Sequence, residues 1–118
     1  MSKNPFITIT MGDAAGIGPE IILQSLAAYY PQSSRPLVIG DMRIFQRAAQ
    51  AVKSRLNFHP VKDPNDGNYQ PGIVNILDLG EPFPDAVPFG KVSPAAGRGS
   101  VAAIRKAHEI SLTYPVKA

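Results

Sequence analysis

The chain has 118 residues and a formal net charge of +3, and 44% of its residues are hydrophobic against 18% charged. This length and composition predict one folded domain and exclude a disordered chain, and the mild charge does not predict a nucleic-acid partner. Because cysteine is absent, disulfides and thiolate metal sites are also excluded.

The first predicted elements are a strand and a helix. Residues 6–10 are apolar and β-branched, which is typical of a buried strand. The same run is too short for a signal or membrane segment, so we expect a cytoplasmic protein without membrane association. A helix is predicted from Gly18-Pro19-Glu20, where proline suits the first turn, up to Pro31.

A second strand and helix follow. Residues 36–40 predict a strand, and Asp41 is positioned to cap a helix that runs to about Ser54. An acid after a second strand is also where a ribose-binding carboxylate is found, but helix capping is the simpler interpretation of Asp41. A short third strand is expected around residues 56–58, ending at His59-Pro60.

The second half of the chain begins with turn residues. Residues 63–68 predict a turn, and residues 72–79 a further strand. Three prolines within residues 81–88 indicate a surface loop, and Ser93-Pro94 opens a helix predicted over about 94–113. Alternating strands and helices with short connections predict an α/β protein with mainly parallel pairing.

The segment Thr10 to Glu20, TMGDAAGIGPE, is the clearest candidate for a site. It places glycines and a carboxylate after a strand, where ligands gather in α/β sheets. A GxGxxG fingerprint is excluded by Ile21, and no Gly-Lys-Ser/Thr follows. The sequence therefore predicts Asp13, Gly16 and Gly18 as candidate cofactor- or substrate-binding residues. A tight turn that needs glycine is an equally open interpretation.

The run MGDAAGIGPE resembles the N-terminal signature of the 4-hydroxythreonine-4-phosphate dehydrogenase family, which includes threonate and erythronate 4-phosphate dehydrogenases. Residues 91–98 resemble the next shared block, and Ala14 stands where the family usually has proline. The resemblance implies an isocitrate/isopropylmalate dehydrogenase-like α/β/α sheet, incomplete in this chain. Residues 1–118 are then the N-terminal part of a larger dehydrogenase whose second domain and catalytic segments follow.

The function implied by the resemblance is an NAD-dependent (or NADP-dependent), metal-requiring oxidation and decarboxylation of 4-phosphooxy-L-threonine in pyridoxal 5'-phosphate biosynthesis. Related enzymes of the family act on phosphorylated threonate or erythronate. The family implies a homodimer and a divalent metal such as Zn, Mg or Co, with ligands beyond Ala118. A different hypothesis is a non-catalytic small α/β domain used for binding or assembly.

No catalytic or metal-binding residue is identified within the chain. His59 and His108 lack the spacing of metal ligands. The chain alone is therefore expected to be inactive. Because the sheet is expected to be incomplete, we also expect poorly covered apolar faces at Ile7, Val38 and Ile76, with a tendency to dimerise or aggregate.

Overall fold

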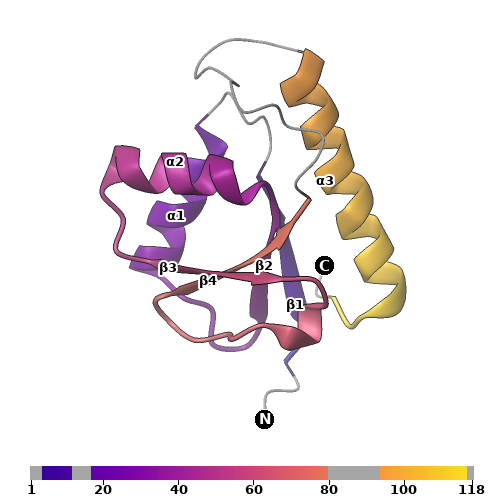
Figure 1. Cartoon of the computed structure of the whole chain (residues 1–118). Helices are drawn as coiled ribbons and strands as arrows, with labels where there is room; N and C mark the ends of the chain where they lie inside the picture. The colour runs from indigo at the N-terminus through magenta and orange to yellow at the C-terminus, as the bar shows by residue number, and fades with distance from the viewer. Residues whose placement is uncertain (1–3, 12–16, 80–93, 117–118) are drawn as a thin grey trace.

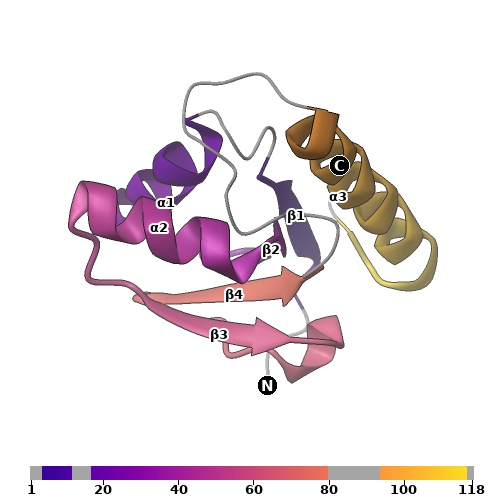
Figure 2. The same ribbon diagram turned by 45° about the horizontal axis from the view of Figure 1, so that its top comes forward.

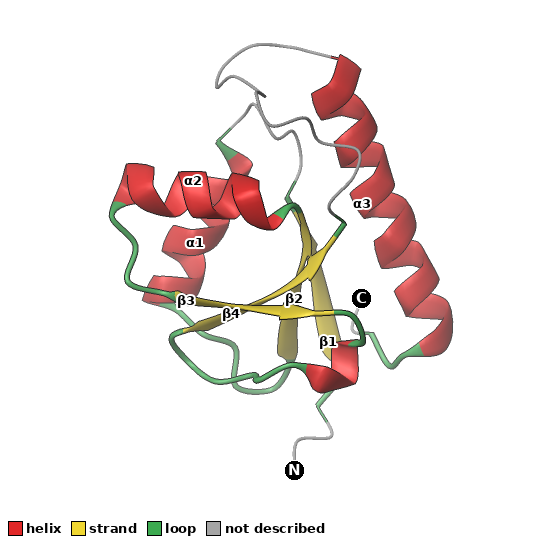
Figure 3. Cartoon of the chain, in the orientation of Figure 1, coloured by secondary structure: helices red, strands yellow, loops and turns green. Residues whose placement is uncertain are grey.

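The computed structural model describes residues 4–11, 17–79 and 94–116, with the backbone alone for residues 94–100. Strands and helices alternate along the chain (Figures 1 and 3). The elements are β1 (Phe6–Thr10), α1 (Gly18–Ala28), β2 (Arg35–Gly40), α2 (Met42–Val52), β3 (Asn57–Val61), the 3-10 helix η1 (Pro64–Asp66), β4 (Ile73–Asp78) and α3 (Pro94–Thr113). The predicted strands and helices are confirmed. The predicted loop at 81–88 and the cap at Ser93 lie outside the described residues.

The four strands form one parallel sheet in the order β1-β2-β4-β3. The sequence prediction ended the third strand near Pro60, whereas β3 continues through it to Val61. Proline is tolerated there because β3 lies at the edge of the sheet. At the opposite edge, Val116 forms a parallel bridge with Phe6, whose N–H donates to the Pro115 carbonyl at 2.8 Å. The last described residues thus begin to pair beside β1.

The direction in which the chain crosses the sheet determines its layers. The connections through α1 and α2 both advance from β1 toward β3, and these two helices lie together on one face (Figure 2). From β3 the chain returns to β4, and then through α3 to the far side of β1. Right-handed crossovers that reverse direction must lie on the other face, which is where α3 packs. The result is an α/β/α arrangement of three layers.

Each face of the sheet carries its own hydrophobic core. Under α1 and α2 the buried residues are Met11, Leu23, Leu26, Val38, Ile44, Phe45, Ala48, Val74 and Ile76. Under α3 they are Leu37, Ile39, Val61, Leu77, Ala103 and Ile110. None of the described helices is long and apolar enough to cross a bilayer.

The expectation of poorly covered sheet faces was wrong for two of its three residues. Val38 and Ile76 are fully buried, while Ile7 is partly buried. Val38 and Ile76 lie on the two central strands, and a pair of helices is wide enough to cover them. The sequence did not reveal that β4 lies between β2 and β3, under the same two helices.

The connection from β3 to β4 is held by a buried polar side chain. Asn75 on β4 is 1% exposed. Its Oδ1 accepts from the Asn68 N–H at 2.7 Å, and its Nδ2 donates to the Asn68 carbonyl at 2.8 Å. Because both polar atoms of Asn75 are satisfied, its burial stabilises the connection instead of weakening the core.

Two tyrosines provide a matched test of this packing. The Tyr30 hydroxyl is buried with no hydrogen-bond partner among the described residues, and burial raises its pKa to about 12. The Tyr69 hydroxyl donates to the Pro64 carbonyl at 2.7 Å. A buried hydroxyl without a partner costs free energy, whereas a satisfied one contributes about 1 kcal/mol.

We therefore expect Tyr30→Phe to leave the free energy of unfolding unchanged or raise it by up to about 1 kcal/mol, because only the unpartnered hydroxyl is removed. Tyr69→Phe should lower it by about 1 kcal/mol, because a hydrogen bond is lost. Urea unfolding followed by circular dichroism measures both. A loss in Tyr30→Phe as large as that in Tyr69→Phe would contradict this account of the Tyr30 hydroxyl.

Candidate functional site

The connections between strands and helices single out the side of the sheet at which the strands end, which we call the carboxyl edge. β2 and β4 are neighbours, but β2 continues into α2 on one face and β4 leads to α3 on the other. In open α/β sheets, ligands bind outside the carboxyl ends of the strands where neighbouring connections diverge. This edge, formed by Met11 after β1, Gly40 and Asp41 at the end of β2, and Asp78 at the end of β4, is the candidate site.

The backbone at this edge is closely packed around Met11. A Cβ on Gly18 would lie 2.5 Å from the Met11 carbonyl oxygen, so the first turn of α1 lies directly against the end of β1. A Cβ on Gly40 would lie 2.7 Å from the Met11 sulfur. The glycine at 18 is therefore required by a contact within the chain, and its φ is not in the left-handed region. A second role of Gly18 toward a ligand stays a prediction.

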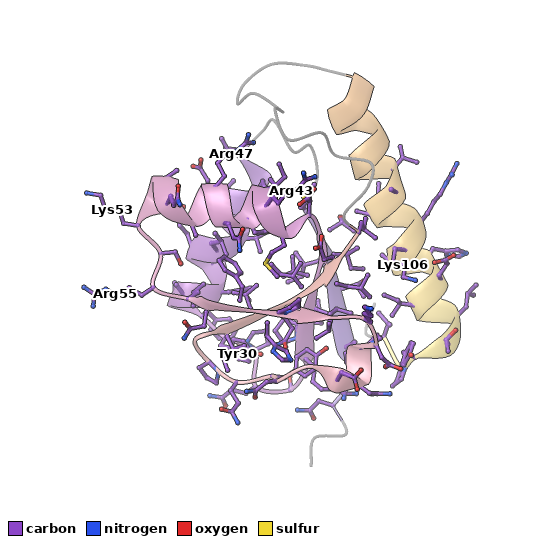
Figure 4. All side chains as sticks on the ribbon, in the orientation of Figure 1. Tyr30, Arg43, Arg47, Lys53, Arg55 and Lys106 are labelled. Atoms are coloured by element: carbon purple, nitrogen blue, oxygen red, sulfur yellow. The ribbon has the colours of Figure 1, made fainter. Side chains whose placement is uncertain are left out.

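The N-terminus of α2 is closed by two carboxylates. Asp41 is 1% exposed, and its Oδ1 accepts from the Arg43 N–H at 2.8 Å. Its Oδ2 forms an ion pair with Arg43 Nη2 at 2.8 Å. Asp78 Oδ1 accepts from the Met42 N–H at 3.2 Å. The interpretation of Asp41 as a helix cap is confirmed, and its carboxylate is occupied by Arg43 (labelled in Figure 4).

The N-terminus of α1, at the same edge, is different. Its N-cap residue, Ile17, makes no side-chain capping hydrogen bond. Ile17 and Ile21 are 67% and 50% exposed, so apolar side chains flank the start of the helix. Glu20 lies in the first turn, where its negative charge disfavours a phosphate. These features suit an uncharged part of a ligand better than an anionic one.

The structure places only some of the predicted site residues. Gly18 is at this edge, whereas Asp13 and Gly16 lie outside the described residues. Asp78 was not singled out by sequence, and its position next to Gly40 follows only from the pairing of β2 with β4. A carboxylate near the end of a predicted strand was the signal available for it.

The described residues do not fit a metal ion. His59 Nε2 lies 3.3 Å from the Asp66 carbonyl at the edge of the sheet, and His108 is exposed on α3. No group of three or more histidine and carboxylate side chains suited to a metal occurs within the described part of the chain. We derive no catalytic step through a metal from these residues.

A hollow of about 530 Å³ lies at the other end of the strands. It is bordered by the end of α1, including Tyr29 and Tyr30, by Arg55 before β3, and by Pro71 and Gly72 before β4. These residues precede the amino ends of their strands, away from the point where the connections diverge. The carboxyl edge is preferred as the candidate site because of the chain topology, and the hollow is not.

A scan against models of protein families finds no match for this chain. The chain is 43% identical over 114 residues to D-threonate 4-phosphate dehydrogenase of Cupriavidus necator. That match covers 96% of this chain and 33% of the relative. Among solved structures, a 4-hydroxythreonine-4-phosphate dehydrogenase from Burkholderia phymatum matches 95% of the chain with a TM-score of 0.84 and 38% identity. The corresponding Klebsiella pneumoniae structure matches with a TM-score of 0.84 and 30% identity.

The chain is thus homologous to α/β dehydrogenases over nearly its whole length, and it spans about one third of the length of these relatives. It belongs to the family of 4-hydroxythreonine-4-phosphate and D-threonate 4-phosphate dehydrogenases, which confirms the resemblance in its sequence.

The contact between Gly18 and Met11 predicts the effect of one added methyl group. Gly18→Ala should lower the free energy of unfolding by about 1–3 kcal/mol, because α1 must shift away from a backbone oxygen that cannot rotate aside. Ser25→Ala, at an exposed position on the same helix, is the control and should change it by less than about 0.5 kcal/mol. Equal stability of the two variants would show that the contact is not a close one.

Proposed function

We propose that this chain is the N-terminal part of an enzyme that oxidises a CH–OH group of a small phosphorylated hydroxy acid, with NAD or NADP as the oxidant. The observation that carries the proposal is the homology of almost the whole chain to enzymes named as dehydrogenases of such substrates. The divergence of the chain connections beside β2 and β4 supports the carboxyl edge as the ligand-binding side.

Two substrates are in question, and they differ at one position. D-Threonate 4-phosphate has a hydroxyl on C2, where 4-phosphooxy-L-threonine has an amino group. The identity is 43% to the threonate enzyme and 38% and 30% to the two hydroxythreonine enzymes. The highest of these three identities is the ground on which D-threonate 4-phosphate is placed first. Oxidation of 4-phosphooxy-L-threonine on the route to pyridoxal 5'-phosphate is the second candidate.

The reaction has the same form for both substrates. When bound, NAD or NADP would supply the oxidant, which would take up the hydride from C3 while the proton of the C3 hydroxyl is lost. The resulting ketone lies β to the carboxylate, so loss of carbon dioxide is the expected next step. In this scheme the described residues bind and orient ligand at the carboxyl edge, where Gly18 lies against the Met11 carbonyl.

The catalytic groups and the ligands of a divalent metal are assigned to sequence beyond Ala118, in a second domain. The whole enzyme is proposed to have an isocitrate/isopropylmalate dehydrogenase-like fold and to be a homodimer. The three-layered α/β/α arrangement and the parallel sheet support this fold. The hypothesis of a non-catalytic binding domain is less favoured, because the relatives named above are dehydrogenases.

A chimera tests the function directly. The matching segment of the Cupriavidus necator enzyme is replaced by this chain, and formation of NADH or NADPH is followed with each of the two substrates and a divalent metal. We expect turnover with a preference for D-threonate 4-phosphate, while the 118-residue chain alone gives none. A folded chimera that oxidises neither substrate would exclude the proposed function. Metal-dependent turnover by the isolated chain would refute the assignment of catalytic groups beyond Ala118.

Asp13 gives a more local prediction in the same chimera. Asp13→Asn keeps the size of the side chain and one acceptor oxygen but removes the charge, so we expect a raised KM for cofactor or substrate. The melting temperature should fall only slightly. A sharp fall in the melting temperature with unchanged kinetics per folded molecule would instead make Asp13 a structural turn residue.

A further inference from the structure

Asp66 is the only aspartate or asparagine in the sequence that a glycine follows. An aspartate in this position can react with its own backbone, because glycine has no side chain to shield the next amide nitrogen. Other aspartates of the chain are not available for this reaction. The carboxylates of Asp41 and Asp78 are bonded to the start of α2, and Asp63 is followed by proline, whose nitrogen carries no hydrogen.

The fold leaves the reacting groups of Asp66 accessible. Asp66 is exposed at the end of η1, the short helix between β3 and β4 (Figure 3), and its carboxylate accepts no hydrogen bond from another described residue. The Gly67 N–H donates to the Pro64 carbonyl at 3.4 Å, beyond the usual range, while the Tyr69 hydroxyl donates to the same oxygen at 2.7 Å. His59 Nε2 lies 3.3 Å from the Asp66 carbonyl oxygen. The peptide group between Asp66 and Gly67 is therefore held only weakly.

We propose that Asp66 is a site of spontaneous modification, at which aspartate isomerises to isoaspartate. In the first step the Gly67 nitrogen attacks Cγ of the Asp66 carboxyl group. The new N–C bond closes a succinimide ring, and the carboxyl OH leaves as water with the amide proton. In the second step water adds to the former main-chain carbonyl of Asp66 and its C–N bond breaks, so that the main chain runs through Cγ. One water leaves and one enters, so the product is an isomer and the reaction needs no oxidant or cofactor.

The modified main chain is longer by one methylene group directly before two close contacts. A Cβ on Gly67 would lie 2.5 Å from the Tyr69 ring, so the backbone at Gly67 has no space to move toward that ring. Asn68 comes next, and its N–H and carbonyl bind both polar atoms of the buried Asn75. Isomerisation therefore releases Asn75 and leaves a buried amide without partners, which destabilises the fold. The proposal does not depend on the proposed enzymatic function.

Incubation of the chain in mildly acidic water enriched in heavy oxygen tests the modification, because each succinimide that opens takes up one heavy oxygen atom. Mass spectrometry of tryptic peptides with electron-transfer fragmentation distinguishes isoaspartate from aspartate at residue 66. The chain unfolded in guanidinium chloride gives the rate without structure, and we expect the folded chain to react within about tenfold of it. Asp66→Glu, which must close a larger ring, should react at least about tenfold more slowly. Asp78, whose carboxylate is bonded to Met42, is the internal control and should stay at background.

The structural consequence is tested on the purified isoaspartyl form. Its midpoint of urea unfolding should lie below that of the unmodified chain, and hydrogen exchange at the Asn68 amide should be faster, whereas Asp66→Glu incubated in the same way should keep both values. Protection of Asp66 by more than about tenfold in the folded chain, or equal uptake of heavy oxygen at Asp66 and Asp78, would overturn the proposed site. An isoaspartyl form with an unchanged midpoint and unchanged exchange would overturn the release of Asn75.

Discussion

The contact between the Met11 carbonyl and Gly18 is the constraint on which the carboxyl edge of the sheet depends. It fixes the first turn of α1 against the end of β1. The two are so close that only glycine, which has no Cβ, fits at position 18. From that position α1 directs Leu23 and Leu26 into the core above the central strands. Met11 and Gly18 are the two sides of this contact, and in the sequence they flank Gly12, Asp13 and Gly16 of the family signature.

The second determinant is the reversal of chain direction after β3. Because crossovers are right-handed, the reversal sends α3 to the face opposite α1 and α2, and it makes the connections of β2 and β4 diverge. At the point of divergence, Asp41 and Asp78 are already bonded to the start of α2. The start of α1 has no side-chain cap, so the two helix starts at this edge differ in what they leave for a ligand.

Local elements were well predicted from sequence because their signals are local. The β-branched run of β1, the cap at Asp41 and the start of α3 at Pro94 each depend on neighbouring residues alone. Strand order is not local, so the sequence showed neither the burial of Val38 and Ile76 nor the bond between Asp78 and Met42. For Gly18, sequence allowed a ligand contact or a tight turn. The structure supplies a third reason, a contact with the chain's own backbone.

Binding of ligand at the carboxyl edge of the sheet can be tested by an NMR titration of the chain with NAD. We expect the amide shifts that change on binding to cluster at Met11, Ile17, Gly18 and Gly40, which surround that edge. Changes clustered instead at Tyr29, Arg55 and Gly72, around the hollow at the amino ends of the strands, would contradict the account.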